Sequence, residues 1–596
     1  MGKTVSIVSG VDQAPPVPVA GDRTVQVWIG GSAGDGIASA GEAFAKVCSR
    51  SGLQLLAYNS YQSVIRGGHV CMHVRVGEEK VYTHGDDHCH FLIALNADTA
   101  ARYADRIVSG GGVLFNADRV QVKPEQLALG AQAFGLPVST MASSLLLQNT
   151  VALGALIRLM DLRMETLVGV IQDTFARKSK MVIEENLAAA KAGYDYAAKH
   201  FPPPRFTLKQ TNKRRLLMSG NQAIALGALA AGCKFYSAYP MTPASSIMHW
   251  LAAHAAQYGL LLKQAEDEIA AINMAIGAGH VGVRAMTGTS GGGFALMTEA
   301  IGMAGMTETP VVIVSSQRGG PSTGLPTKTE QGDLFQMLGA SQGDFPRMLL
   351  APRTVEECFR LTTEAFNLAE RFQCPVMIAS DLLLSEHQET IDGLDLNVPI
   401  DRGELVNGHG VEGEYKRFAV TPTGISPRAF PGHEGTIFVA ASDEHGEDGV
   451  LISDVFTDPP TRARMMEKRM RKVETALGEL PDPMMWGQAD AQVMLVGWGS
   501  TYGLIREVIQ RLAGEGITAN TLELTHLWPM KGDAIGTLLR QAKRLIDIEG
   551  NFTAQLARLL SSETGVRIAD RIVKYDGEPF TPGPVVKQIK EMLRHG

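Results

Sequence analysis

The stretch TVQVWIGGSAGDGIASAGEAFAKVC at residues 24–48 decides the class of fold. Its beginning, Thr24–Ile29, is rich in β-branched and aromatic residues and predicts a strand. The glycine-rich loop Gly30–Gly36 follows, and the apolar spacing of Ile37–Cys48 then predicts a helix. A strand, a short loop and a helix in succession are the building unit of α/β folds.

The same succession recurs along the chain. Strands are predicted at 70–76, 91–95, 233–239, 283–286, 310–315, 375–379, 492–497, 519–522 and 544–548, and helices at 145–159, 182–199, 222–231, 249–258, 462–475 and 501–515. Strands that alternate with helices through short loops imply mostly parallel sheets covered on both faces. We therefore expect an α/β protein with several domains.

Changes in composition predict the domain limits. The expected segments are an N-terminal arm (1–23), a first α/β domain (24–200), a proline-rich basic linker (201–215), a second α/β domain (216–390), a connecting arm rich in Gly, Pro, Asp and His (391–482), and a third α/β domain (483–596). A length of 596 residues agrees with about four folding units.

The composition excludes several classes of protein. The chain has 55 basic and 62 acidic residues, a net charge of −7, which argues against a general nucleic-acid binder. An apolar content of 45% excludes a disordered scaffold. No apolar run reaches the roughly 18–20 residues of a membrane span, and the N-terminus does not resemble a secretory signal. We expect a cytoplasmic protein that does not bind membranes.

Cysteine and histidine patterns give no metal centre. None of the six cysteines forms a C-x-x-C pair, so neither a zinc ribbon nor a typical four-cysteine iron–sulfur site is predicted. His88-Cys89-His90 resembles a metal cluster, but neighbouring strand residues point to opposite faces and no second ligand pair is visible. We expect a structural or surface role for these three residues.

Two loops in the first domain are candidates for anion binding. Gly30–Gly36 joins a strand to a helix, where backbone amides favour an anion such as a phosphate of coenzyme A. A tight turn or a subunit contact would explain the same glycines. In the segment Tyr61–Gly68, Arg66 stands beside Gly67 and Gly68, which suits either a carboxylate or phosphate, or an interface turn.

Two further motifs lie at strand and helix ends in the second domain. In Tyr239-Pro-Met-Thr-Pro243 two prolines fix a loop after a strand, and the hydroxyl of Thr242 lies at the edge where α/β sheets bind ligands. Glu266-Asp-Glu268 precedes an almost wholly apolar helix. Acidic residues there could simply complement the helix dipole, but a semi-buried Glu268 with a raised pKa would suit proton transfer.

Two more loops follow strands of this domain. Thr287–Gly293 is a run of small residues that permits close approach of a ligand. The segment Ser315–Thr327 places Arg318 at a strand end, where it could bind a carboxylate with two hydrogen bonds or form an ordinary salt bridge.

Taken in order, these motifs resemble the alpha subunits of 2-oxoacid:ferredoxin oxidoreductases, and most closely those that act on 2-oxoglutarate. The resemblance also rests on Glu330-Gln-Gly-Asp333 and Gly424-Ile-Ser-Pro-Arg428. The first domain resembles the family's gamma subunit, here fused ahead of alpha. The third α/β domain resembles the transketolase C-terminal domain.

The resemblance implies roles for individual residues. Glu268 would hydrogen-bond N1′ of the thiamine diphosphate pyrimidine and thereby promote loss of the thiazolium C2 proton. Thr242 would touch cofactor and substrate, and Arg318 would bind the substrate carboxylate. The loop through Thr323 and Thr327 would influence which 2-oxoacid is chosen. The expected contacts to thiamine diphosphate or coenzyme A are Tyr239, Pro240, Thr242, Glu268, Gly30, Gly31, Gly34, Gly36 and Arg66.

Partner subunits follow from what the chain lacks. Thiamine diphosphate enzymes bind Mg²⁺ through Gly-Asp-Gly and a later Asn, but Asp35 and Asn59 lie in a different kind of domain, and we reject them as ligands. The resemblance therefore implies a beta subunit that carries the Mg²⁺–diphosphate site and a [4Fe–4S] cluster. We also expect ferredoxin as electron acceptor and a dimer of alpha–beta heterodimers.

The expected reaction is oxidative decarboxylation of 2-oxoglutarate with coenzyme A to succinyl-CoA and CO₂, with the physiological direction left open. Pyruvate or a branched-chain 2-oxoacid is the alternative substrate. Met241, Ser246 and Gln342-Gly-Asp344 depart from the usual family pattern at positions relevant to this choice. A catalytically inactive scaffold is the alternative of another class, and activity of a Glu268→Ala variant discriminates between them.

Overall fold

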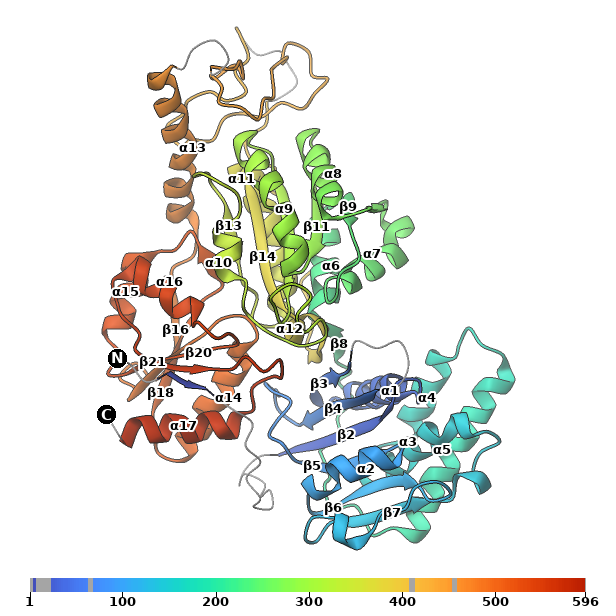
Figure 1. Ribbon diagram of the computed structural model, residues 1–596. Helices are drawn as coiled ribbons and strands as arrows, with labels where there is room; N and C mark the ends of the chain where they lie inside the picture. The colour runs from blue at the N-terminus through green and yellow to red at the C-terminus, as the bar shows by residue number, and fades with distance from the viewer. Residues whose placement is uncertain (1–3, 7–22, 63–67, 407–412, 453–457, 595–596) are drawn as a thin grey trace. The chain divides into compact units, whose positions relative to one another are not determined.

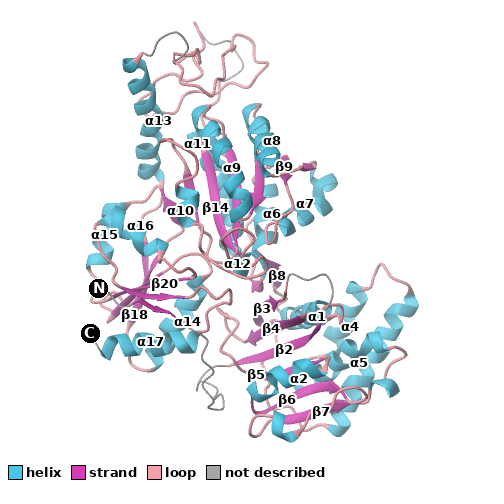
Figure 2. Ribbon diagram, in the orientation of Figure 1, coloured by secondary structure: helices cyan, strands magenta, loops and turns pink. Residues whose placement is uncertain are grey.

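The computed structural model describes residues 4–6, 23–62, 68–406, 413–452 and 458–594. The chain forms two compact units (Figure 1). Unit 1 consists of residues 1–7, 220–385 and 394–580, and unit 2 of residues 8–219, 386–393 and 581–596. Sheets and helices alternate in both units (Figure 2), which confirms the predicted α/β class.

Unit 2 is built on an eight-stranded sheet of order β7-β6-β5-β2-β4-β3-β15-β8. Its strands are β2 (Thr24–Ser32), β3 (Gln54–Ser60), β4 (His69–Gly77), β5 (Cys89–Ala94), β6 (Ile107–Asn116), β7 (Gln132–Leu136), β8 (Leu216–Ser219) and β15 (Gln388–Ile391). Strands β2, β5, β6 and β7 are parallel neighbours, whereas β4 pairs antiparallel with β2 and β3. The sheet therefore has a parallel half that continues into an antiparallel half.

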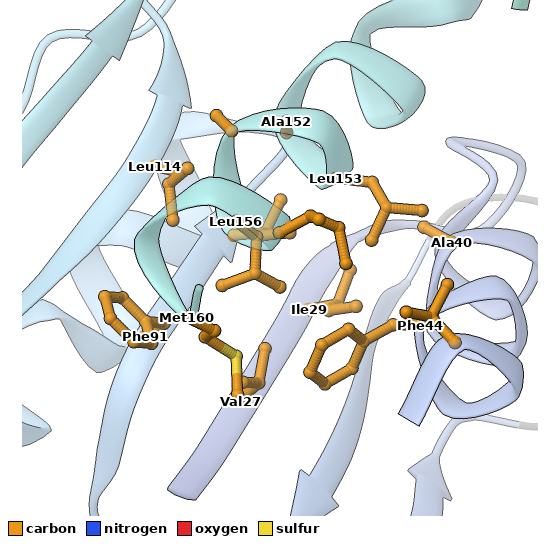
Figure 3. Close-up of a cluster of buried hydrophobic side chains, with 14 of the residues drawn as sticks. Val27, Ile29, Ala40, Phe44, Phe91, Leu114, Ala152, Leu153, Leu156 and Met160 are labelled. Carbon is orange, nitrogen blue, oxygen red and sulfur yellow. The ribbon is translucent and has the colours of Figure 1, made fainter. Parts of the chain in front are cut away.

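The helices of unit 2 are α1 (Ile37–Arg50), α2 (Ala97–Tyr103), α3 (Gln148–Leu159), α4 (Met164–Thr174), α5 (Lys180–His200) and α17 (Pro582–Arg594), with short 3₁₀ turns at Ala104–Arg106, Pro124–Gln126, Val138–Thr140 and Leu145–Leu147. Aliphatic and aromatic side chains of β2, α1 and α3 interlock in the core (Figure 3). Val27, Phe44 and Leu156 are fully buried there. The apolar spacing that predicted these elements is thus the spacing of their buried faces.

Unit 1 contains a seven-stranded sheet of order β10-β9-β11-β12-β14-β13-β19. Its strands are β9 (Phe235–Ala238), β10 (Leu261–Gln264), β11 (Ala285–Thr289), β12 (Val311–Gln317), β13 (Met348–Leu350), β14 (Pro375–Asp381) and β19 (His526–Trp528). All neighbours are parallel except β19, which runs antiparallel to β13. Helices α6 (Gly220–Ala230), α7 (Ser245–Tyr258), α8 (Glu268–His280), α9 (Gly291–Met306), α10 (Leu334–Leu338), α11 (Val355–Phe372) and α12 (Leu382–Glu386) connect these strands.

A second sheet in unit 1 has the order β1-β21-β20-β17-β18-β16. Its strands are β1 (Thr4–Ser6), β16 (Met484–Gly487), β17 (Val493–Val496), β18 (Ala519–Glu523), β20 (Leu545–Glu549) and β21 (Asp570–Val573), and its helices α14 (Thr501–Gly514), α15 (Gly532–Arg540) and α16 (Gln555–Thr564). Strand β1 lies in the expected N-terminal arm and pairs parallel with β21. Its three residues are too few to show a sequence period.

The segment expected as a connecting arm contains helix α13 (Pro459–Glu479) and long loops. Buried ion pairs fix it to the amino edge of the seven-stranded sheet: Glu308, just before β12, bonds Lys468 and Lys472 of α13. Glu370 of α11 bonds Arg428 of the segment at 2.9 Å. The segment is therefore attached opposite the carboxyl edge, where α/β sheets bind ligands. The domain limits given above stay predictions.

In the order β10-β9-β11-β12, the chain places β10 on one side of β9 and then β11 and β12 on the other side. The strand order therefore reverses between β9 and β11. Loops that follow the two strands diverge at such a point and leave a crevice outside their carboxyl ends. Tyr239–Pro243 follows β9, and Ser290 follows β11. Among the described residues, no helix has the length and apolar content needed to cross a membrane.

Candidate active site

The loop after β9 is held rigidly at the carboxyl edge. Its Thr242–Pro243 peptide bond is cis. The side-chain amide of Asn221 donates hydrogen bonds to the carbonyl of Pro243 at 2.9 Å and to the hydroxyl of Ser246 at 2.7 Å. The polar position Ser246 therefore helps to hold the loop from the adjoining helix α7.

Glu268 is the first residue of α8 and is buried, with 3% of its surface exposed. Its neighbour Asp267 caps the helix by accepting a hydrogen bond from the backbone of Ala270 at 2.7 Å. Glu268 is therefore free of the capping role. Its Oε1 atom has no hydrogen-bond partner among the described residues. Burial raises the pKa of Glu268, as expected, although the side chain is more deeply buried than the semi-buried position predicted.

The glycines at the start of α9 bring this helix against Glu268. A Cβ atom on Gly293 would lie 2.4 Å from Glu268 Oε1 and 2.1 Å from the hydroxyl of Thr289. The same hydroxyl lies 3.8 Å from the sulfur of Met241, in the loop after β9. The carboxyl ends of β9 and β11 and the starts of α8 and α9 therefore meet around the carboxylate of Glu268.

Several polar atoms of this region are buried without a hydrogen-bond partner among the described residues. They are Asn221 Oδ1, Tyr236 OH, Thr287 Oγ1, Ser290 Oγ, Ser315 Oγ, Ser316 Oγ and Glu268 Oε1. Buried polar atoms are nearly always hydrogen-bonded in native proteins. Their concentration on β9, β11, β12 and the adjoining helix starts is typical of a site that receives a polar ligand.

Arg318 follows β12 and reaches the loop after β9. Its Nη1 atom donates to the carbonyl of Thr242 at 2.8 Å. The structure therefore brings together Thr242, Arg318 and, through Met241 and Thr289, Glu268. Burial lowers the pKa of Arg318, whereas the charge of Asp333 raises it.

The loop expected to influence substrate choice closes on itself. The backbone of Leu325 donates to the carbonyl of Gly319 at 2.8 Å, and that of Gly319 donates to Lys328 at 3.1 Å. Thr323 lies on the exposed part of this loop, whereas Thr327 is buried. The two threonines are thus in different environments, and Tyr239, at 41% exposure, lies on the surface.

The first glycine loop lies in unit 2. Gly30 and Gly31 belong to strand β2, and a Cβ on Gly30 would come within 2.6 Å of Thr99. Gly34 and Gly36 have φ angles of 103° and 78°, which suit glycine. The carboxylate of Asp35 accepts a hydrogen bond from the backbone of Ser32 at 2.8 Å, so one loop amide is already occupied by an anion of the chain itself. Arg66 lies outside the described residues.

Glu330 and Asp333 of the motif Glu330-Gln-Gly-Asp333 follow the loop that contains Thr323 and Thr327. The sequence alone indicated no role for these two carboxyl groups. Burial, reinforced by the charge of Asp333, raises the pKa of Glu330 to about 7. Burial raises the pKa of Asp333 to about 6, although Arg318 opposes this. A Cβ on Gly291 would lie 2.4 Å from Asp333 Oδ2, which places Asp333 at the start of α9. Sequence reasoning missed them because acidic residues in a loop are ordinarily solvated.

Within the described part of the chain, no three His, Cys, Asp or Glu side chains form a group that could hold a metal ion. His88 and His90 instead contact Gln26: the backbone of Gln26 donates to His90 Nδ1 at 3.0 Å, and its side chain lies 3.1 Å from His88 Nε2. These contacts fit the structural role expected for the pair.

Comparisons with known proteins identify the family of this chain. Residues 226–466 match the family model described as pyruvate flavodoxin/ferredoxin oxidoreductase, thiamine diP-bdg, and residues 26–196 match pyruvate ferredoxin/flavodoxin oxidoreductase. The 2-oxoacid:ferredoxin oxidoreductase subunit alpha of Sulfolobus sp. is 32% identical over 95% of this chain and 97% of the relative. The 2-oxoglutarate oxidoreductase subunit KorA of Mycobacterium tuberculosis is 30% identical over 96% and 92%.

A solved structure extends the comparison to the fold. The 2-oxoglutarate:ferredoxin oxidoreductase from Magnetococcus marinus is 35% identical, with a TM-score of 0.90 over 96% of this chain and 99% of that chain. Sequence and fold therefore agree over nearly the whole length, and the resemblance inferred from the motifs is confirmed. The chain belongs to the alpha subunits of the 2-oxoacid:ferredoxin oxidoreductases and contains their thiamine diphosphate-binding domain.

Proposed function

We propose that this chain is the alpha subunit of a 2-oxoglutarate:ferredoxin oxidoreductase. In the overall reaction, 2-oxoglutarate and coenzyme A are converted to succinyl-CoA, CO₂, one proton and two electrons. The two electrons are passed one at a time to ferredoxin. The Magnetococcus marinus relative supports this substrate, because its description names 2-oxoglutarate, coenzyme A and succinyl-CoA as bound. Relatives named KorA in bacteria and archaea support it as well.

The observation that carries the proposal is the buried, unpartnered Oε1 atom of Glu268. A protonated ring nitrogen of an aminopyrimidine is the partner that such a carboxylate needs, and the missing side chain of Gly293 lets the start of α9 pack directly against Glu268. The residues present therefore fit the pyrimidine end of thiamine diphosphate. When bound, this cofactor supplies the nucleophilic carbon that allows a 2-oxoacid to lose CO₂.

The other side chains bind and orient. Arg318 binds the carboxylate of the 2-oxoacid, because a guanidinium matches the geometry of a carboxylate. Thr242 presents its hydroxyl beside cofactor and substrate from a loop that the side-chain amide of Asn221 holds in place. Tyr239 and Pro240 complete that loop, while Thr323 and Thr327 influence which 2-oxoacid side chain is accepted.

The remaining groups lie on partners. We infer that a beta subunit carries Mg²⁺ with the diphosphate and a [4Fe–4S] cluster, and that two alpha–beta heterodimers associate. Relatives named as alpha subunits support a partner subunit. The loop containing Gly30, Gly31, Gly34 and Gly36, with Arg66, is proposed to bind part of coenzyme A. A cytoplasmic location and a transketolase C-terminal-like fold for 483–596 stay predictions.

Substrate choice is tested with the complex reconstituted from this chain and its beta subunit. Reduction of a viologen dye is measured with 2-oxoglutarate, pyruvate and a branched-chain 2-oxoacid at saturating coenzyme A. The proposal predicts the highest kcat/KM for 2-oxoglutarate. A higher value for pyruvate would support the alternative, which the pyruvate-based family descriptions favour.

A further inference from the structure

Gln331 lies in the motif Glu330-Gln-Gly-Asp333, between strand β12 and helix α10, and has no role in the site proposed above. Only 2% of its surface is exposed. Its side-chain amide donates a hydrogen bond to the carbonyl of Trp498 at 2.7 Å and accepts one from the backbone of Gly550 at 2.9 Å. Both polar atoms of this buried side chain are therefore satisfied, which fixes its position.

The backbone around Gln331 is bonded to the same loops. Its N–H donates to the carbonyl of Gly550 at 2.6 Å, and its carbonyl accepts from the side chain of Asn551 at 3.1 Å. Gln555, at the start of α16, donates to the carbonyl of Gly332 at 2.7 Å. The motif is thus attached to loops of the second sheet of unit 1, the six-stranded sheet.

The partners of Gln331 lie where the strand order of the six-stranded sheet reverses. Strand β18 lies on one side of β17, whereas β20 and β21, which come later in the chain, lie on the other side. These strands are parallel, so a crevice forms outside the carboxyl ends of β17 and β20. Trp498 follows β17, and Gly550 follows β20. Gln331 therefore occupies the place where sheets of this kind bind their ligands.

Glycines in the two loops leave room for the amide of Gln331. A Cβ atom on Gly499 would lie 2.9 Å from Gln331 Nε2, and one on Gly550 would lie 3.3 Å from Gln331 Oε1. Gly499 also has a φ angle of 55°, which favours glycine. The loop backbones can therefore approach the side chain closely.

The same segment contacts the candidate active site on its other side. The backbone of Asp333 donates to the side chain of Gln317 at 2.9 Å, and Gln317 directly precedes Arg318. The side chain of Gln336 donates to the carbonyl of Gly291, the first residue of α9, at 3.0 Å. Residues 331–336 therefore join the six-stranded sheet to the end of β12 and to the start of α9.

We propose that Gln331 is a positioning residue for the reaction: by filling the crevice of the six-stranded sheet, it sets the place of Arg318 at the end of β12 and of the start of α9 against Glu268. The inference rests on the roles proposed above for Arg318 and Glu268. It does not depend on which 2-oxoacid is used, because both roles concern groups that all 2-oxoacids and the cofactor share.

The physical reason is that the amide of Gln331 satisfies two buried backbone groups at once. Without it, the carbonyl of Trp498 and the N–H of Gly550 lose this partner. Buried groups are costly to leave without a hydrogen bond, so the segment and the two loops would shift to find other partners. Since residues 331–336 contact the residue before Arg318 and the first residue of α9, the shift would reach the site.

The first experiment measures kcat and KM of a Gln331→Ala complex reconstituted with the beta subunit, using the 2-oxoacid that the unsubstituted complex turns over best. We expect an intact assembly whose kcat/KM is lower by about 10–100-fold, because a displacement of about 1 Å at a reacting centre has an effect of this size. KM should rise through Arg318, and kcat should fall through the start of α9.

Asn520→Ala is the matched control. Asn520 lies on β18 of the same sheet, is 2% exposed and donates to the carbonyl of Gln488 at 2.8 Å, so this substitution also removes a buried hydrogen bond. It should lower the melting temperature as Gln331→Ala does, but leave kcat and KM within about twofold of the unsubstituted values. Equal kcat/KM in the two variants, measured where both are folded, would overturn the inference.

The charged groups around Gln331 decide how a glutamic acid would titrate at this position. Asp381 of β14 lies 3.5 Å from the Cβ position of Gly499, and Glu549 of β20 bonds the side chain of Asn551. Glu330 adjoins Gln331 in the chain. The lysines of the neighbouring loops, Lys328 and Lys574, pair with Glu578 and Asp576. Burial and the surrounding carboxyl groups therefore favour the protonated form of a glutamic acid at 331.

Gln331→Glu keeps the shape of the side chain and tests the hydrogen bond itself. The protonated acid can donate to the carbonyl of Trp498 as the amide does, whereas the ionised form places one oxygen against another. At pH 6 kcat/KM should therefore lie within about threefold of the unsubstituted complex and at least about fivefold above Gln331→Ala. A Gln331→Glu complex as impaired at pH 6 as Gln331→Ala would overturn the inference.

Arg318→Lys and Glu268→Gln separate this inference from the proposed function. If both complexes keep the kcat and KM of the unsubstituted complex, the proposed site is wrong and the role of Gln331 is wrong with it. If both are impaired while Gln331→Ala behaves like Asn520→Ala, only the positioning role of Gln331 is wrong.

Discussion

The carboxylate of Glu268 lies directly against the backbone of Gly293, because a Cβ atom on this glycine would come within 2.4 Å of Glu268 Oε1. One residue earlier, a Cβ on Gly292 would meet nothing nearer than the carbonyl of Ser322 at 4.0 Å. The two glycines occupy the same helix α9, so they separate the effect of a methyl group at the site from its effect on the helix.

Gly293→Ala should therefore impair the site, and Gly292→Ala should not. The methyl group at position 293 must displace Glu268 or α9, and misplacement of a catalytic group by about 1 Å can cost about 100-fold in rate. At position 292 alanine should be neutral or stabilise the helix by about 0.5–1 kcal/mol. Turnover and thermal melting of both complexes are the measurements. Equal activities in the two variants would contradict this placement of Glu268.

Glu268→Gln should stabilise the chain in the absence of thiamine diphosphate. Burial raises the folded-state pKa of Glu268, so its contribution to stability is complete at acid pH and is lost as pH rises through that raised value. The amide avoids a buried unpaired charge, which costs about 1–3 kcal/mol. Melting temperatures at pH 5 and pH 8 check this: the gain from the substitution should be larger at pH 8. A loss of stability at pH 8 would contradict it.

Glu308→Gln should destabilise unit 1 strongly. Its carboxylate bonds Lys468 at 2.6 Å and Lys472 at 2.5 Å, all three fully buried. Removal of one partner of a buried ion pair costs about 3–5 kcal/mol. Burial opposes ionisation, but Lys468, Lys472 and Arg417 hold the pKa of Glu308 well below its usual range, so the carboxylate of Glu308 is itself ionised at neutral pH.

Glu479→Gln is the control for that substitution, because the exposed Glu479 joins the same helix α13 to Arg371 at 3.0 Å. An exposed ion pair contributes less than about 1 kcal/mol. Urea unfolding of the two variants measures the difference. Similar midpoints for Glu308→Gln and Glu479→Gln would show that the buried cluster does not hold α13 in place.

Asp35→Asn tests the proposed coenzyme A site. The asparagine oxygen can still accept the hydrogen bond that Ser32 donates to Asp35 at 2.8 Å, but the negative charge in the glycine loop is removed. If a phosphate of coenzyme A binds there, KM for coenzyme A should fall about threefold, since repulsion between nearby charges is worth about 0.5–1 kcal/mol at a surface. An unchanged KM would place the phosphates of coenzyme A away from this loop.

Much of the fold could be predicted because each element carries its own signal. The helix predicted at 37–48 is α1 (Ile37–Arg50), and the strand predicted at 375–379 is β14 (Pro375–Asp381). The site loops could also be predicted, since Thr242 and Arg318 follow strands and parallel strands bring their carboxyl ends to one edge. The contact between Arg318 and Thr242 follows from that arrangement.

What could not be predicted depends on contacts between distant segments. Nothing local indicates that Asp333 meets Gly291, or that Glu308 pairs with lysines of α13. Glu308 precedes and Asp333 follows the strand predicted at 310–315, yet their partners lie on other elements. Strand β1 could not be predicted for the same reason, because its strand conformation depends on pairing with the distant strand β21.

Turnover by a Glu268→Gln complex tests the central claim most directly. The complex is reconstituted with the beta subunit, and reduction of a viologen dye with 2-oxoglutarate and coenzyme A is measured together with bound thiamine diphosphate and the mass of the assembly. We expect an intact assembly whose kcat is lower by at least about 100-fold, because the carboxylate would control the protonation of the aminopyrimidine. An intact Glu268→Gln complex with unchanged kcat would contradict the account.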